Sequence, residues 1–235
     1  MNNFDYGCDI RIISLGWDCL PRTFLHRMNL YNFKDKRKVR MPFDGCVTPY
    51  ASVCEYIKND FDSVFEELRY DSDIGDIFTK NCQYNHERTS DCGEFKNQMK
   101  LRIKQFNQEI KENKNKANEY IIFFLQHHTY PTELIDIFKR KYPSLKFKIF
   151  CNNNNRKSKK SVLTDDCYYV NVKKPYRKYE NLPHQIKSIE GENYEQKLLK
   201  EFLNCISEIS NNKYDADKIF SNRNFDYISN EDRLI

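Results

Sequence analysis

The first buried segment of the chain reads IRIISL at residues 10–15, and it is followed directly by GWDC at residues 16–19. A short isoleucine-rich run that stops at a glycine is typical of a buried strand. Asp18 can cap a following helix, and Pro21 fits the first turn of that helix, where a missing N–H costs no hydrogen bond. We therefore predict a strand that turns sharply into a helix at residues 16–19.

Strand-like and helix-like segments alternate along the rest of the chain. Apolar residues at helical spacing predict a helix after Thr48-Pro49 and further helices at residues 94–113, 132–141 and 192–209. Continuous apolar or aromatic runs predict strands at residues 120–125, 147–151 and 167–172. This alternation favours an α/β fold with a mainly parallel sheet and helices on both faces, a three-layer, Rossmann-like arrangement.

The length and composition suit one domain. The chain has 235 residues, of which 39% are hydrophobic and 31% are charged. That is enough apolar material for a single core. We expect one α/β domain over residues 1–210, with an irregular stretch at 69–93, and a polar C-terminal tail at 211–235.

The charge and cysteine content narrow the class of protein. The formal net charge of +5 comes mostly from scattered lysines, so we expect no nucleic-acid partner. No run approaches the roughly 18 apolar residues of a membrane span, and the start lacks the pattern of a signal peptide. The nine cysteines are odd in number and spread along the chain, which favours reduced thiols. We expect a cytoplasmic protein, and the sequence does not set its oligomeric state.

Cys19 is the candidate nucleophile of this sequence. It falls at the start of the predicted first helix, where unpaired N–H groups favour the thiolate over the thiol. Neighbouring backbone N–H groups could also hold a developing oxyanion. A small thiol beside a core is equally typical of a buried structural cysteine, so the position alone leaves both interpretations open.

Several motifs follow one another in an order that resembles a known family. They are Ser14-Leu15-Gly16, then Cys19 after two residues, Leu25-His26-Arg27, Pro42-Phe43-Asp44 and Thr48-Pro49. This series resembles the opening of the DUF1796 family, a bacterial and viral family described as papain-like cysteine peptidases. The resemblance covers roughly residues 10 to 150, and His86, Arg102 and the strand at 120–125 occupy further family positions. The chain departs from the family at Gly45, where Trp is usual, and at Asp18, where Asn is usual.

The resemblance implies a cysteine hydrolase acting on a protein or small-molecule substrate. In this reading Cys19 is the nucleophile, His86 the general base and Asp44 the residue that orients the imidazole. It also implies a papain-like α+β fold, in which a helix carrying the cysteine packs against an antiparallel sheet. We keep that fold as the alternative to the parallel sheet.

The residues leave alternatives for each partner of the thiol. His127 and His128, which follow the strongest strand, are the second choice of base. Asp44 could instead cap its own turn, and Asp91 is a rival for the orienting role. Gly16, Trp17, Asp18 and Phe43 flank these positions and are the expected substrate-binding residues.

Two other chemistries and a non-catalytic role compete with the hydrolase hypothesis. Cys82, His86 and Cys92 could hold zinc, but their spacing is not a standard pattern, so we predict no metal. Residues 16–20 could hold a phosphate or nucleotide at the helix N-terminus, as in a transferase-type or binding domain. Gly16 stands alone among only six glycines, so no cofactor fingerprint is present. An interaction module without chemistry is the third possibility.

Overall fold

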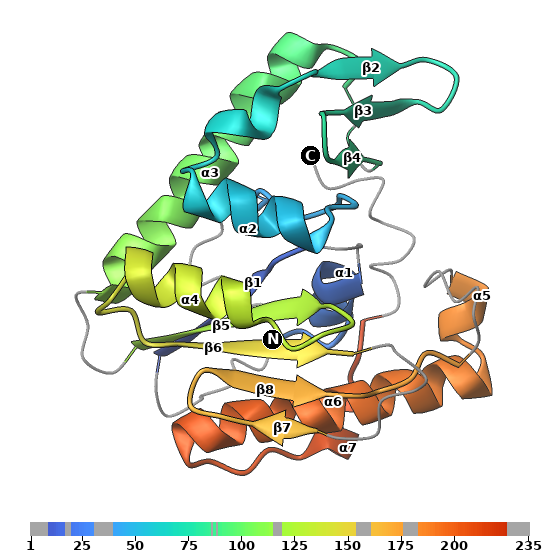
Figure 1. The fold of residues 1–235 in the computed structure, drawn as a ribbon. Helices are drawn as coiled ribbons and strands as arrows, with labels where there is room; N and C mark the ends of the chain where they lie inside the picture. The colour runs from blue at the N-terminus through green and yellow to red at the C-terminus, as the bar shows by residue number, and fades with distance from the viewer. Residues whose placement is uncertain are drawn as a thin grey trace.

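The main sheet of the computed structural model has five strands in the order β1-β5-β6-β8-β7 (Figure 1). The structure describes residues 9–16, 20–30, 40–85, 87, 89–114, 119–153, 161–175 and 183–224. The four parallel strands are β1 Asp9–Ser14, β5 Glu119–Gln126, β6 Phe147–Asn152 and β8 Cys167–Val170. A short strand, β7 Val162–Leu163, pairs antiparallel with β8 at one edge.

The central parallel strands are apolar on both faces. In β5, Ile121 to Leu125 are fully buried, and all of β6 is buried. Continuous apolar runs of this kind form strands that are covered on both sides. Leucine, isoleucine and phenylalanine of the predicted strands therefore lie at the centre of the molecule.

Helices cover both faces of this sheet, which confirms the predicted α/β fold. One face carries α2 Tyr50–Lys58, α3 Cys92–Lys114 and α4 Thr132–Lys141. The other carries α1 Leu20–Arg27, α5 Pro183–Ile186, α6 Ile189–Ser210 and α7 Ala216–Ser221. Successive residues of β5 show the two layers, since Phe123 stacks on Phe138 of α4 and Phe124 stacks on Phe202 of α6. The antiparallel sheet of the papain-like alternative is not the arrangement of these strands.

A second, smaller sheet forms where the sequence predicted irregular structure. It is antiparallel and consists of β2 Arg69–Asp71, β3 Asp76–Phe78 and β4 Gln83–Tyr84, preceded by the 3-10 helix η1 Asp62–Phe65. Strands of two or three residues are too short to show a period of two, so the pattern did not reveal them. A bridge between Val47 and Gln83 joins this sheet to the turn before α2.

Part of the segment expected as a polar tail packs onto the domain. Ile219 of α7 is buried, and the backbone N–H of Asn224 donates to the carbonyl of Arg27 at 2.7 Å. Arg223 forms an ion pair with Glu192 of α6. Among the described helices, none has the length and hydrophobicity that a membrane span requires.

Candidate functional site

The connection from β1 to α1 lies at the carboxyl edge of the parallel sheet. The N–H of Leu15 still donates to the carbonyl of Phe124 at 2.9 Å, and Gly16 then takes a positive φ of 83° that ends the strand. Helix α1 begins at Leu20. The predicted residues Trp17, Asp18 and Cys19 fall outside the described residues. In parallel α/β sheets, ligands bind at this edge.

Gly16 is held against the turn that precedes α2. A Cβ atom at Gly16 would lie 3.2 Å from the Cβ of Thr48 and 3.5 Å from the Cβ of Phe43. Phe43, an expected substrate-binding residue, is buried, and its ring packs against Phe61 and Phe106 in the aromatic core. The Pro-Phe-Asp motif and the end of β1 are therefore neighbours in space.

Asp44 closes its own turn. Its Oδ2 accepts a hydrogen bond from the backbone N–H of Met41 at 2.9 Å, and its own N–H donates to the carbonyl of Met41 at 3.0 Å. The same oxygen lies 4.0 Å from Nε of Arg22, which joins the turn to α1. These are the contacts of a turn-capping aspartate. His86, the predicted imidazole partner of Asp44, lies outside the described residues.

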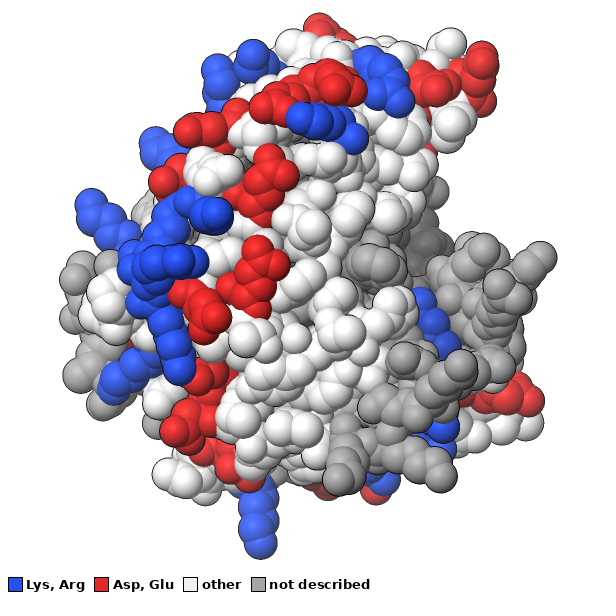
Figure 2. All heavy atoms as spheres, in the orientation of Figure 1, with Lys and Arg blue, Asp and Glu red and all other residues white. Residues whose placement is uncertain are grey.

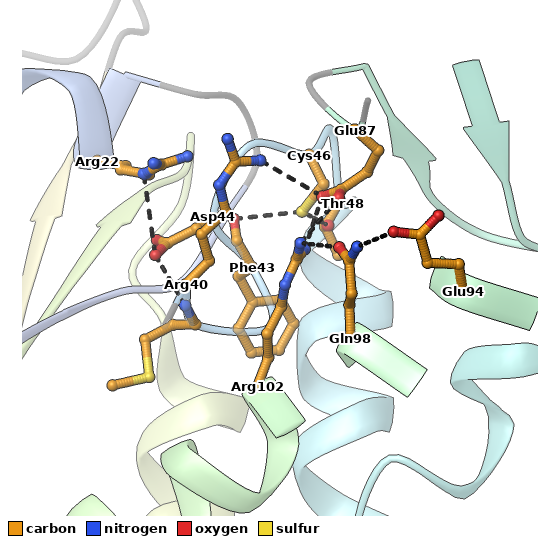
Figure 3. Close-up of polar contacts among 11 residues, drawn as sticks. Arg22, Arg40, Phe43, Asp44, Cys46, Thr48, Glu87, Glu94, Gln98 and Arg102 are labelled. Carbon is orange, nitrogen blue, oxygen red and sulfur yellow. Dashed lines mark hydrogen bonds and ion pairs between the residues drawn. The ribbon is translucent and has the colours of Figure 1, made fainter. Parts of the chain in front are cut away.

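Three arginines from separate parts of the chain converge beside this turn, as Figure 3 shows. Arg22 comes from α1, Arg40 from the segment before the turn and Arg102 from α3. Arg102 binds Glu87 through two hydrogen bonds of 2.6 and 2.8 Å, and Nη1 of Arg40 lies 3.6 Å from the same carboxylate. We call Arg22, Arg40, Arg102, Asp44 and Glu87 the arginine cluster.

The arginine cluster is buried enough for its charges to act strongly on one another. Burial and the charges of Arg22 and Arg102 lower the pKa of Arg40, which Glu87 and Asp44 partly oppose. Burial, with smaller contributions from the charges of Arg22 and Arg40, lowers the pKa of His26 in α1 to about 3. His26 is therefore neutral at pH 7. No pattern in the sequence distinguishes Arg22 or Arg40, and the prediction did not select them.

His127 lies at the same edge of the sheet as Gly16. It follows β5, which pairs in register with β1, and its ring stacks on that of Tyr50 with centroids 3.9 Å apart. Its Nε2 is 2.8 Å from the hydroxyl of Thr129. Burial, and to a lesser extent His128, lowers the pKa of His127 to about 4. The imidazole is therefore neutral at pH 7, the form that a general base needs.

A row of buried polar residues ends three adjacent strands. Ser14, Gln126 and Asn152 are the last residues of β1, β5 and β6, and each is at most 1% exposed. Because side chains alternate between the two faces along each strand, all three lie on the face that carries α1 and α6. The side chain of Asn152 accepts from the N–H of Val172 at 2.9 Å and donates to its carbonyl at 3.3 Å. A polar residue directly after an apolar run was the available sequence signal, and the prediction did not use it.

The described cysteines are free thiols in structural positions. Six of these seven are buried, and Cys92 at the start of α3 is partly exposed. Burial raises the pKa of Cys54 to about 11 and that of Cys167 to about 12, and it also raises the pKa of Cys82. Protonated thiols of this kind are poor nucleophiles and poor metal ligands.

The zinc alternative has little support from the residues that the structure covers. Sγ of Cys82 lies 3.5 Å from the hydroxyl of Tyr56 in the core. No group of three or more His, Cys, Asp or Glu side chains within the described ranges could hold a metal ion. His86, the third predicted ligand, is not among those residues.

Comparisons of the chain with models of protein families, with curated proteins and with solved structures find no match in any of the three. The likeness to the DUF1796 family therefore stays a prediction from the motifs between residues 10 and 150. The α/β fold does not depend on it, because the strand order and pairing show that fold directly.

Proposed function

We propose that the protein is a cysteine-dependent hydrolase in which Cys19 is the nucleophile and a histidine is the general base. The observation that supports this is the position of the strand-to-helix turn. Gly16 ends β1 at the carboxyl edge, Leu20 begins α1, and Cys19 directly precedes Leu20 in the chain. Arg22, in the first turn of α1, brings the arginine cluster to the same end of the helix. A helix N-terminus and nearby guanidinium groups both favour a thiolate.

The proposed reaction has two steps. The histidine takes the proton of the Cys19 thiol, the thiolate attacks an acyl carbon, and the leaving group departs with that proton from the histidinium as a thioester forms on Cys19. The neutral histidine then removes a proton from water, which attacks the thioester and releases the acid and the thiolate. Backbone N–H groups of the α1 N-terminus can stabilise the oxyanion in both steps.

The general base is His86 in this proposal, and His127 is the described alternative. His127 lies at the carboxyl edge and is neutral at pH 7, so it can accept a proton, but its lowered pKa makes it a weaker base than an unperturbed imidazole. Turnover and thiol reactivity of two variants distinguish the two assignments. His86→Gln should remove turnover and the enhanced reactivity of the thiol, while His127→Gln should leave both close to wild type. The reverse result would assign the base to His127.

Thiol labelling across pH tests the nucleophile. With iodoacetamide and peptide mapping, Cys19 should label with an apparent pKa below the roughly 8.5 of a free cysteine. Cys92 is the internal reference, because it is the partly exposed thiol among the described ones. Cys19→Ser should abolish hydrolysis, and Cys92→Ser should not. If Cys19 labels no faster than Cys92 at every pH, Cys19 is not the nucleophile.

A second candidate is a phosphate- or nucleotide-binding domain of the transferase type at the same edge. The position of the turn from β1 to α1 favours it, since such domains bind ligands beyond the carboxyl ends of parallel strands and at helix N-termini. Cys19→Ser separates the candidates, because it should leave ligand affinity unchanged in a binding domain.

A further inference from the structure

We propose that the exposed face of helix α3 binds the phosphate backbone of double-stranded DNA without reading the base sequence. Four lysines lie along this face, and we call them the lysine stripe: Lys96, Lys100, Lys104 and Lys111. The scatter of lysines along the chain led us to expect no nucleic-acid partner, but the fold of α3 gathers these four. Helix α3 packs on the opposite face of the sheet from α1, so the inference does not depend on the hydrolase proposal.

The lysine stripe is narrow and extends along most of a long helix. Each residue of an α-helix turns by about 100° and rises by about 1.5 Å, so the four positions lie within about 80° of one another and span about 22 Å. All four residues are exposed, whereas Phe95, Met99 and Phe106 on the other side of α3 are fully buried. Figure 1 shows that α3 reaches from the small sheet to the amino edge of the main sheet.

No carboxylate of α3 balances the lysine stripe. From residue 96 to residue 111 eight residues are exposed, of which four are lysine and none is acidic. All three glutamates of the helix accept hydrogen bonds from other side chains, and these glutamates are Glu94, Glu109 and Glu112. Lys96 lies over the ring of Phe65, and the other three lysines form no ion pair with any of the described residues. Like charges four residues apart destabilise a helix, so an anion bound along the stripe would stabilise α3.

The residue types on this face favour phosphate over carboxylate groups. Paired recognition of a carboxylate favours arginine, whereas lysine binds phosphate as a point charge, and no arginine of α3 is exposed. Asn97 and Asn107 flank the lysines, and amide side chains also contact phosphate oxygens. The exposed face of α3 carries no aromatic residue, so it lacks the stacking platform that single-stranded nucleic acid uses.

The shape of a helix favours duplex DNA over duplex RNA. The major groove of B-DNA, about 12 Å wide, admits an α-helix, whereas that of duplex RNA is deep and narrow. The 23 residues of α3 make it about 34 Å long, close to one turn of B-DNA. A helix lying along the rim of the groove therefore places its lysines beside a continuous row of phosphates.

The test is binding of the full chain to fluorescein-labelled DNA duplexes, followed by fluorescence anisotropy as the NaCl concentration rises. We expect a Kd of about 1–10 µM at about 50 mM NaCl. The logarithm of the association constant should fall against the logarithm of the salt concentration with a slope of about −3 to −4, because each lysine displaces about one counterion. Two duplexes of unrelated sequence should bind equally well.

A triple variant assigns the binding to the lysine stripe. Lys100→Gln, Lys104→Gln and Lys111→Gln together should weaken binding at least about tenfold and reduce the salt slope to about −1. Glutamine has nearly the helix propensity of lysine, and these positions are exposed, so the variant should fold like wild type. Far-UV circular dichroism checks the fold.

The matched control removes the same charge from the other face of the sheet. Lys197→Gln, Lys213→Gln and Lys218→Gln together change three exposed lysines on α6, on α7 and between them. This variant should bind DNA as wild type does, because net charge alone does not create the site. Cys19→Ser should also bind like wild type, so failure of the hydrolase proposal and failure of the DNA site give different results.

Three results would overturn the inference. One is the absence of binding at the lowest salt concentration. Another is an equal loss of affinity in the two triple variants, which would mean that the DNA responds to net charge and not to α3. The last is tighter binding of an RNA duplex of the same sequence, or of polyglutamate, at equal salt.

Discussion

The two edges of the main sheet both carry charged residues but differ in how those residues are held. At the amino edge, where β5 and β6 begin, a cleft of about 320 Å³ is lined by two lysines, two aspartates and aromatic residues. These lining residues include Tyr120, Lys139, Lys146, Asp165 and Asp166. Lys139 forms an ion pair of 2.6 Å with Asp166, and its side chain is 55% exposed.

The carboxyl edge has buried charges in place of exposed ones. There the arginine cluster places three cations against two anions among the described residues, with Arg102 and Glu87 each at most 5% exposed. By contrast, Figure 2 shows basic and acidic side chains lying next to one another on the surface around the carboxyl end of α4, close to the amino-edge cleft.

The difference shows where the fold depends on particular charged residues and where it does not. Solvent screens exposed and balanced charges, so these ion pairs contribute little to stability and need no particular partner. Buried charges need specific partners and destabilise the fold when a partner is lost. We therefore locate the candidate site at the carboxyl edge, where the buried charges are, and not at the open cleft.

The largest expected effect comes from removing one member of a buried pair. Arg102→Met should destabilise the protein by about 3–5 kcal/mol, because it leaves Glu87 buried without its bidentate partner. Lys139→Met at the amino edge should leave the unfolding midpoint unchanged within error. Urea unfolding of both variants measures the contrast. Similar losses in the two variants would remove the distinction between the edges.

Acid should destabilise the folded protein because His26, near the carboxyl edge, has a lowered pKa. Its pKa is about 3 in the folded protein and near 6.5 when unfolded, so the unfolded chain takes up the proton first. Stability is therefore complete above about pH 6.5 and falls as the pH drops toward 3, by about 2 kcal/mol between pH 7 and pH 5. His26→Gln should flatten this part of the curve of unfolding free energy against pH. A curve as steep as that of wild type would show that His26 does not titrate as described.

The smallest expected loss of stability comes from replacing a glycine of positive φ with alanine. Comparing two such glycines separates the cost of packing from that of backbone strain at the turn after β1. Gly16 and Gly75 have nearly the same positive φ, at 83° and 82°, but only at Gly16 would a Cβ meet a neighbour within 4 Å. Gly75→Ala should cost about 1 kcal/mol for the backbone alone, and Gly16→Ala about 2 kcal/mol. Chemical unfolding measures both. Equal losses of unfolding free energy would mean that Thr48 and Phe43 move to accommodate the added methyl group.

Much of the fold could be predicted from hydrophobic patterns. The helix expected at residues 132–141 is α4 with the same bounds, and the strands expected at 120–125 and 147–151 are β5 and β6, each longer by one or two residues. Strands β2, β3, β4 and β7 were missed because two or three residues carry no usable period.

The candidate site could be predicted only in part. The end of the first strand at Gly16 followed from the sequence, whereas the closeness of Gly16 to Thr48 and Phe43 is a finding of the tertiary structure. Arg22 and Arg40 were not selected, since an arginine in a polar loop or on a short helix has no distinguishing pattern. Their significance depends on Glu87 and Arg102, which lie far away along the chain.

The sequence by itself determined the order along the chain of the long helices and of the parallel strands, because burial selects apolar residues at the local period of each element. It also determined where the first strand stops. Only the tertiary structure decided which charged residues became buried together at the carboxyl edge and which stayed exposed at the amino edge. The energy of a charge depends on its distance from other charges and from water, and spacing along the chain does not encode those distances.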